Sequence, residues 1–285
     1  MNIYKYVGRG VIENIVMEAV KEDKALSDIT TQMCVADDTM GIGIIKAKEN
    51  GILSGIQITE IVLQTFGPAV VSYKTEDGNS IKRGDKLAVI KGKMRGILSS
   101  ERIILNFIQR MSGIATQTNI FVKMAESKNI KILDTRKTTP GLRYIEKYAV
   151  MCGGGVNHRM NLADEIMIKD NHLTALKHNL DIIDRMKNKY PKKRIVVEVD
   201  NIKFLDNVLD YPIDRIMLDN MKPAQIKKAV NKINGICEIE VSGNINEENI
   251  KRYLIDGIDY ISMGKLTHSY RSLDVSMDIE YAESQ

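Results

Sequence analysis

The stretch IVVEVDNIKFLDNVLDYPIDRIML, residues 195–218, carries the pattern that decides the fold. It opens with a β-branched apolar run at 195–199, which predicts a buried strand, and closes with a short apolar run at 216–218 that predicts a second strand over 215–218. Apolar side chains recur at helical spacing over 202–208, between the two runs. A helix that joins two strands is typical of the parallel βα unit, because parallel neighbours need a crossover connection.

The same alternation continues on both sides of this stretch. Helices are expected at 174–189, 223–233 and 247–254, and strands at 237–241 and 260–263, with further strands beginning at Ile130, Ala149 and Glu165. This gives about seven strands, close to the number in a complete α/β barrel. The predicted fold class is therefore α/β with a parallel, barrel-like sheet.

The first part of the chain predicts a separate, small α+β domain. An amphipathic helix is expected from Val11 to Lys24, followed by a mixture of short strands and one helix up to residue 91. A long helix is then expected from Leu98 to Ser127, with Arg102 in its first turn and small residues near Gly113 that permit a bend. We place the domains at 1–112 and 113–270, and expect the tail, 271–285, to pack on the first domain.

Composition excludes several classes of protein. The net charge of +4 over 285 residues is small, so neither a nucleic-acid groove nor a polybasic membrane patch is expected. The three cysteines, Cys34, Cys152 and Cys237, are widely spaced, which favours reduced thiols over disulfides or a zinc site. The chain has no apolar run of membrane length, and its first residues lack the apolar core of a signal peptide. We therefore expect a cytoplasmic protein.

Ionic side chains gather in the segment from Leu133 to His172. A strand that ends near Leu133 is followed by Arg136 and Lys137, and a later strand that ends near Ile168 is followed by Lys169. In α/β barrels the ligand lies at the carboxyl ends of the strands. Like charges about 4 Å apart repel by up to about 4 kcal/mol per pair at an effective dielectric constant near 20, so this group of cations indicates an anionic ligand.

The later strand ends carry acids and then small residues. Glu198 and Asp219 lie at neighbouring strand ends, and Ser242-Gly243-Asn244 lies between a strand and the helix expected to follow it. Backbone N–H groups at such a position can bind a phosphate. Met263-Gly264-Lys265 follows the last strand, where barrels often place a second phosphate loop. SGN alone is equally typical of an ordinary turn, but together with MGK it favours phosphate binding.

The motifs of this chain resemble the quinolinate phosphoribosyltransferases, also called nicotinate-nucleotide pyrophosphorylases, of the type II phosphoribosyltransferase family. The resemblance rests on DTRKTTPGLR (134–143), EKYAV (146–150), CGGGVNHRM (152–160) and IKDNH (168–172), and extends from SDITT (27–31) to MGKLTHS (263–269). It implies an incomplete, open α/β barrel preceded by a small α+β sandwich domain. It also implies that quinolinate and phosphoribosyl pyrophosphate give nicotinate mononucleotide, pyrophosphate and CO₂, in the synthesis of NAD.

The resemblance implies a role for each candidate residue. Lys137, Lys169, Glu198 and Asp219 are the expected catalytic residues, and Glu198 and Asp219 are the expected protein contacts of Mg²⁺, which otherwise binds substrate oxygens. Cations suit the two carboxylates of quinolinate, and the amide loops suit a sugar phosphate. The remaining expected substrate-binding residues are Arg102, Thr135, Arg136, His158, Arg159, Ser242, Gly243, Asn244, Met263, Gly264 and Lys265.

The family is built as a homodimer with shared active sites, so Arg102 is expected to reach a partner's barrel, and a trimer of dimers is a further expectation. Two alternatives remain open from the sequence. One is a paralogous phosphoribosyltransferase with another acceptor, such as the homologues associated with molybdate transport. The other is a non-catalytic barrel that binds a phosphosugar, against which the acids Glu198 and Asp219 argue.

Overall fold

The computed structural model describes residues 1–282, and the chain folds into two compact units. Unit 1 comprises residues 1–119, 138–154 and the C-terminal residues from 266, and unit 2 comprises residues 120–137 and 155–265. The chain therefore leaves unit 1, returns to it for one helix, and ends in it. The domain boundary expected near residue 112 stays a prediction.

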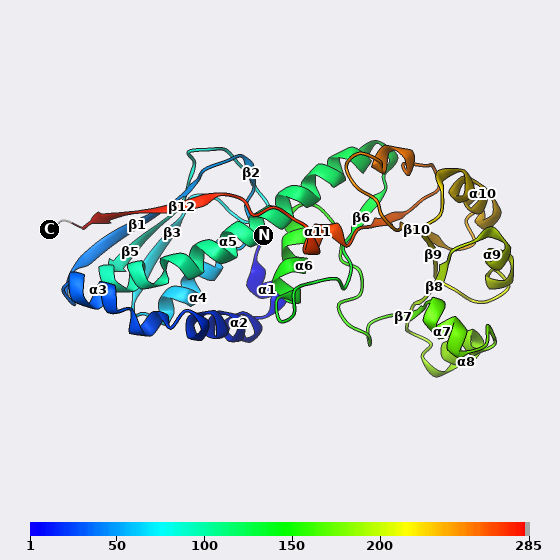
Figure 1. Ribbon diagram of the computed structural model, residues 1–285, viewed down its shortest axis with the longest axis horizontal. Helices are drawn as coiled ribbons and strands as arrows, with labels where there is room; N and C mark the ends of the chain where they lie inside the picture. Colours follow the sequence, from blue (N-terminus) through cyan, green and yellow to red (C-terminus); the bar gives the residue numbers. More distant parts are fainter. Residues whose placement is uncertain (283–285) are drawn as a thin grey trace. The chain divides into compact units, whose positions relative to one another are not determined.

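Unit 1 is built on an antiparallel sheet with the strand order β12-β1-β5-β3. Figure 1 shows β12, near the C-terminus, beside β1, and their register runs from Gly41↔Tyr281 to Ala47↔Val275. The strands of this sheet are β1 (Met40–Ala47), β3 (Ala69–Tyr73), β5 (Lys86–Lys93) and β12 (Val275–Tyr281). A second sheet has two strands, β2 (Gly51–Ile52) and β4 (Ser80–Ile81). The last strand of the chain thus completes the first sheet.

The helices of unit 1 are α1 (Ile3–Val7), α2 (Arg9–Glu22), α3 (Ile29–Cys34), α4 (Ile58–Gln64) and α6 (Arg143–Cys152), and α5 (Met94–Ala125) begins in unit 1 and ends in unit 2. Glycines let α5 lie close to its neighbours. A Cβ on Gly43 would lie 3.0 Å from Ile97, and a Cβ on Gly113 would lie 2.3 Å from the carbonyl oxygen of Arg271. Glycine at these two positions therefore keeps α5 against β1 and against the segment that precedes β12.

Asp77 is a buried carboxylate at the centre of unit 1. Its Oδ1 accepts the backbone N–H of Ile56 at 3.1 Å, and its Oδ2 accepts the hydroxyl of Tyr148 at 3.0 Å. Burial raises the pKa of Asp77 to about 6 in spite of these hydrogen bonds. The folded protein therefore binds this proton more tightly than the unfolded chain does.

The burial of Asp77 predicts a pH-dependent stability. The proton's contribution is fully present below the unfolded pKa, near 3.8, and is lost as the pH rises through the folded pKa of about 6. Between about pH 5 and about pH 8, wild type should lose about 1 kcal/mol that Asp77→Asn does not lose. Denaturant unfolding of both proteins at both pH values measures the difference. Asp85→Asn, in an exposed turn of the same unit, is the control, and it should lose the same unfolding free energy between the two pH values as wild type does. If Asp85→Asn escaped this loss as Asp77→Asn does, the prediction would be contradicted.

Unit 2 is built on a six-stranded parallel sheet with the order β6-β11-β10-β9-β8-β7. Its strands are β6 (Lys131–Leu133), β7 (Ile166–Ile168), β8 (Ile195–Val199), β9 (Arg215–Asp219), β10 (Glu238–Ser242) and β11 (Tyr260–Ser262). The helices that follow them in this unit include α7 (Asp170–Ala175), α8 (Ile182–Lys189), α9 (Ile202–Val208) and α10 (Pro223–Ile233), and α11 (Lys265–His268) follows β11. β6 and β7 are the two edges, so the parallel sheet is open, as expected from the resemblance.

Three sequence-based assignments in the barrel region were wrong. The strand expected at Ala149 is part of helix α6, in which residues 145–150 are all buried. A short apolar run that is buried all round has no period that separates strand from helix. The helix expected at 174–189 is two helices, because Lys177 and His178 have positive φ values of 50° and 58° and end the first.

The third wrong assignment is the helix expected at 247–254. Only a short 3₁₀ turn, η3 (Ile250–Arg252), forms there. The side chain of Asn246 accepts the N–H groups of Glu248 and Asn249, which offers the backbone an alternative to helical hydrogen bonds. Arg102 was also misplaced: α5 begins at Met94, so Arg102 lies beyond its first turn and is exposed.

No helix among residues 1–282 is both long enough and apolar enough to cross a membrane.

Candidate active site

The carboxyl ends of four neighbouring strands bring together the acids and one of the predicted lysines. Lys169 follows β7, Glu198 lies in β8, Asp219 ends β9 and Ser242 ends β10. These strands are adjacent in the sheet, and Ser242 pairs directly with Asp219 in the register. The four residues therefore lie at the carboxyl ends of neighbouring strands of one sheet, as the sequence predicted.

Glu198 is the centre of this group. Its Oε2 lies 3.5 Å from the Nζ of Lys169. Burial, and then repulsion from Asp219, raise the pKa of Glu198, and the attraction of Lys169 only partly opposes them. Two half-buried carboxylates repel each other, and a cation bound beside them relieves that repulsion. Such a site therefore favours the binding of a cation.

The two acids fit a magnesium ion held mainly by its substrate. Among residues 1–282, no group of three or more His, Cys, Asp or Glu side chains could hold a metal ion by itself. Mg²⁺ commonly keeps several waters and binds through one or two carboxylates together with phosphate oxygens. Glu198 and Asp219 have the chemistry of such an incomplete protein site.

The predicted phosphate loop at Ser242-Gly243-Asn244 is shaped by Asn220. Gly243 has a φ of 103°, and a Cβ there would lie 2.3 Å from the Oδ1 of Asn220. The same Oδ1 accepts the Nδ2 of Asn244 at 3.2 Å, and the N–H of Asn220 donates to the carbonyl of Ser242 at 2.9 Å. We did not predict a role for Asn220, although its position directly after Asp219 at a strand end was a usable signal.

The second predicted phosphate loop, Met263-Gly264-Lys265, forms an ion pair with Glu247, which lies three residues after the first loop. The Nζ of Lys265 lies 2.5 Å from the Oε2 of Glu247. Met263 is buried, and its N–H donates to the carbonyl of Leu133 at 2.9 Å, which ties the end of β11 to the end of β6. The amide N–H of Met263 is therefore engaged by Leu133, and a contact of Met263 with the substrate stays a prediction.

The buried carboxylate of Asp134 joins the loop after β6 to residues 157 and 158. Its Oδ1 accepts the N–H of His158 at 2.9 Å, and its Oδ2 accepts the Nδ2 of Asn157 at 2.5 Å. Thr135 lies directly after it, and its hydroxyl accepts the N–H of Lys137 at 3.0 Å. These bonds hold the loop after β6 next to residues 157–159, more than 20 positions later in the sequence.

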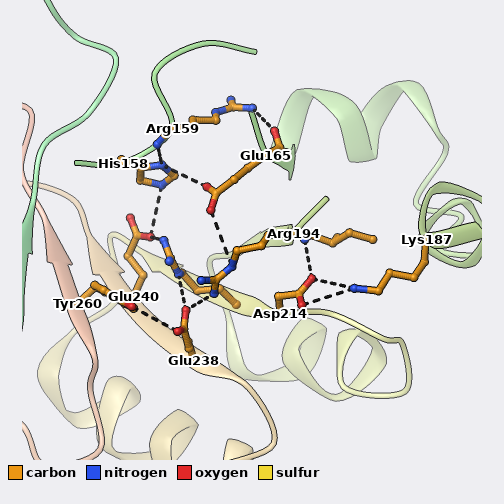
Figure 2. A network of polar contacts seen from close by, with 11 residues as sticks. His158, Arg159, Glu165, Lys187, Arg194, Asp214, Glu238, Glu240 and Tyr260 are labelled. Carbon is orange, nitrogen blue, oxygen red and sulfur yellow. Dashed lines mark hydrogen bonds and ion pairs between the residues drawn. The ribbon is translucent and has the colours of Figure 1, made fainter. Parts of the chain in front are cut away.

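Arg136 and Arg159 are half-buried arginines of unit 2. Burial, and then the charge of Arg136, lower the pKa of Arg159, while the Nη1 of Arg159 donates to the carbonyl of Glu165 at 3.0 Å. Figure 2 shows Arg159 and its bond to Glu165 above the ring of His158. Both guanidinium groups are half-buried, and each can bind a planar carboxylate through two N–H groups.

Arg102 lies on α5 in unit 1, whereas the other predicted site residues from 135 to 137 and from 158 to 265 lie in unit 2. Its contact with the substrate stays a prediction.

Comparison with known proteins identifies the family. The profile of the quinolinate phosphoribosyl transferase N-terminal domain matches residues 28–112, and that of the C-terminal domain matches residues 114–278. The chain belongs to the quinolinate phosphoribosyltransferase family. This confirms the resemblance seen in the motifs and the enzyme class, a pentosyltransferase.

The relatives of this phosphoribosyltransferase cover most of its length. It is 39% identical to the nicotinate-nucleotide pyrophosphorylase [carboxylating] of Mycobacterium leprae, over 88% of this chain and 91% of the relative. It is 36% identical to quinolinate phosphoribosyltransferase [decarboxylating] 1b of Nicotiana tabacum, over 94% and 82%. The crystal structure of NadC from Streptococcus pyogenes matches with a TM-score of 0.91 and 38% identity, over 95% of this chain and 97% of that one. These matches confirm the predicted fold class.

Proposed function

We propose that this protein transfers phosphoribose from phosphoribosyl pyrophosphate to quinolinate, in a Mg²⁺-dependent reaction with decarboxylation. The products are nicotinate mononucleotide, pyrophosphate and CO₂, and the reaction belongs to NAD biosynthesis. The observation that carries the proposal is the pair of cations Arg136 and Arg159, on two segments that Asp134 bonds together, in the same unit as the carboxylates Glu198 and Asp219 of the neighbouring strands β8 and β9. The first pair suits a pyridine dicarboxylate and the second a metal-bound pyrophosphate.

The anion-binding residues orient the acceptor. Arg136 and Arg159, with Lys169 near Glu198, can neutralise the two carboxylates and fix the plane of the pyridine ring. The ring nitrogen then faces C1 of the ribose while the loops at Ser242-Gly243-Asn244 and Gly264-Lys265 hold the 5-phosphate. Orientation of this kind supplies a large part of the rate enhancement of a two-substrate reaction.

The chemical steps need no protein nucleophile. The bond from C1 to the pyrophosphate oxygen breaks, and the ring nitrogen forms the new bond to C1. Bound Mg²⁺ would stabilise the negative charge of the leaving pyrophosphate. Lys137 is placed after β6, where it can help to neutralise the pyrophosphate. The C2 carboxylate then leaves as CO₂, its electron pair stays beside the cationic ring nitrogen, and C2 takes up a proton.

The choice between quinolinate and nicotinate tests the proposal. Nicotinate has one carboxylate less, so it would leave part of the cation group uncompensated. We expect kcat/KM for quinolinate to exceed that for nicotinate by at least about 100-fold, measured by the release of pyrophosphate with each acid. Equal turnover of both acids would contradict the proposed acceptor, and binding without any release of pyrophosphate would favour a non-catalytic barrel.

We also propose that the protein is a homodimer with shared active sites, that it forms a trimer of such dimers, and that it is cytoplasmic. The first rests on the family resemblance and on the exposure of Arg102, which lies outside the unit that contains the barrel.

A further inference from the structure

A fully buried carboxylate, Glu240, lies beside the ring of His158. Its Oε2 is 3.4 Å from the Nε2 of His158 and 3.1 Å from the Nη1 of Arg215, and both its side chain and that of His158 are almost inaccessible to solvent. Figure 2 shows the imidazole above Glu240, with the carboxylate of Glu165 beside the other ring nitrogen, 3.5 Å from Nδ1. Glu240 comes from the middle of β10 and reaches a residue 82 positions earlier in the chain.

We propose that Glu240 is a positioning residue for quinolinate binding, which acts by fixing the orientation of His158. The inference rests on the proposed function, in which His158 and Arg159 belong to the acceptor site. Glu240 itself is enclosed in the barrel and does not touch the substrate.

Both ring nitrogens of His158 face a carboxylate, Nδ1 that of Glu165 and Nε2 that of Glu240, and Nδ1 also has a backbone donor beside it. Its Nδ1 accepts the backbone N–H of Arg159 at 2.7 Å, so the proton of the neutral ring lies on Nε2. That nitrogen faces Glu240. A flipped ring would place a carbon against the carboxylate and lose the bond to Arg159. The amide of Arg159 and the carboxylate of Glu240 therefore act together to select the tautomer and the rotamer of His158.

The orientation of His158 is passed on to Arg159. Nδ1 of the ring accepts the backbone N–H of Arg159, and the guanidinium of Arg159 donates to the carbonyl of Glu165 at 3.0 Å. If His158 turned, the backbone at Arg159 would lose one of its constraints, and the guanidinium would be less precisely placed for a carboxylate. A loosened support of this kind commonly weakens binding by 10-fold or more.

Glu240 is itself held rigidly. Arg215 is also bound by Glu238, at 3.1 Å between Nε and Oε2, and its guanidinium lies 4.3 Å from the ring centre of Tyr260. Burial would raise the pKa of Glu240, but its contacts with His158, Ser262 and Arg215 hold that pKa below its ordinary value. A carboxylate that is enclosed, charged and costly to desolvate is well suited to fix one partner.

Glu238 provides a matched control. It lies two residues before Glu240, on the same face of β10, and it contacts the same arginine. Its other partners are Arg194 and Tyr260, whereas Glu240 faces His158. Both variants remove one charge that pairs with Arg215, although the side chain of Glu238 is 34% exposed and that of Glu240 is fully buried, so loss of that pairing alone would give both variants the same kind of defect. A positioning role predicts that only Glu240→Gln changes the acceptor site.

The test uses the full chain and quinolinate alone, without phosphoribosyl pyrophosphate. Titration calorimetry should give a Kd for quinolinate about 10-fold higher in Glu240→Gln than in wild type, and a Kd within about 2-fold of wild type in Glu238→Gln. Glu240→Asp keeps the charge but withdraws the carboxylate by one methylene, so it should behave like Glu240→Gln. It replaces that variant if circular dichroism shows that Glu240→Gln does not fold.

A second readout reports on the ring directly. The chain has four histidines, so ¹⁵N-histidine spectra are simple, and His158→Gln assigns the signal. The ring shifts of His158 should indicate the Nε2–H tautomer in wild type and Glu238→Gln, and a mixture in the Glu240 variants. Equal affinities and equal His158 shifts in the Glu238 and Glu240 variants would overturn the inference. Failure of wild type to bind quinolinate would instead overturn the proposed function, and the spectra would still test the link from Glu240 to His158.

Discussion

Glu198→Gln should lower kcat/KM for phosphoribosyl pyrophosphate by at least about 100-fold, a loss of about 2.7 kcal/mol of transition-state stabilisation. The substitution keeps the size of the side chain and removes its charge. It therefore abolishes the ion pair with Lys169 and removes the carboxylate charge that we propose interacts with the metal-bound pyrophosphate. Steady-state kinetics at saturating quinolinate measure the loss.

The binding of quinolinate alone should change much less in this variant, by no more than about 3-fold, because the acceptor is assigned to the cations. Asp200→Asn is the matched control. Asp200 is an exposed acid at the end of the same strand, and its Oδ1 accepts the Nδ2 of its neighbour Asn201 at 2.7 Å. An equal loss in Asp200→Asn, or a loss confined to quinolinate binding in Glu198→Gln, would contradict the assignment.

Two inactive variants should restore activity when they are combined. Arg102→Ala and Glu198→Ala should each be nearly inactive alone. If the site is shared between subunits, random pairing makes about half of the dimers hybrids, and each hybrid has one intact site of two. Co-expression of the two variants should then return about a quarter of wild-type activity. Turnover of the purified mixture measures the recovery.

A second mixture separates a shared site from one within a single chain. Wild type combined in equal amounts with the double variant, Arg102→Ala with Glu198→Ala, should retain about half of wild-type activity if each chain forms its own site. If sites are shared, both sites of a hybrid are defective, and only about a quarter should remain. No recovery in the first mixture together with half activity in the second would exclude the shared site.

Much of the barrel followed from local sequence patterns. The strands at 195–199 and 215–218 and the helix between them were predicted correctly, because burial of a strand or of one helix face leaves its period in the chain. The same patterns placed Lys169, Glu198, Asp219 and Ser242 at strand ends. Parallel strands share one carboxyl edge, so their common location needed no coordinates.

The errors arose where local pattern and tertiary packing compete. The run at 148–150 is buried on all sides of α6, so its apolar character could not distinguish a helix from a strand. The helix expected at 247–254 was replaced by side-chain bonds from Asn246, which the apolar spacing does not report.

The sequence by itself determined the fold class, the family and the residue types at the strand ends, since each is written in short-range periodicity or in contiguous motifs. Only the tertiary structure decided which of these residues support one another. In the strand EIEVS, Glu240 reads as an ordinary alternating polar position, because a period of two distinguishes the faces of a strand but not solvent from a partner. Its contact with His158 exists because β10 lies inside the parallel sheet, between β11 and β9, where a segment from much earlier in the chain packs against its buried face.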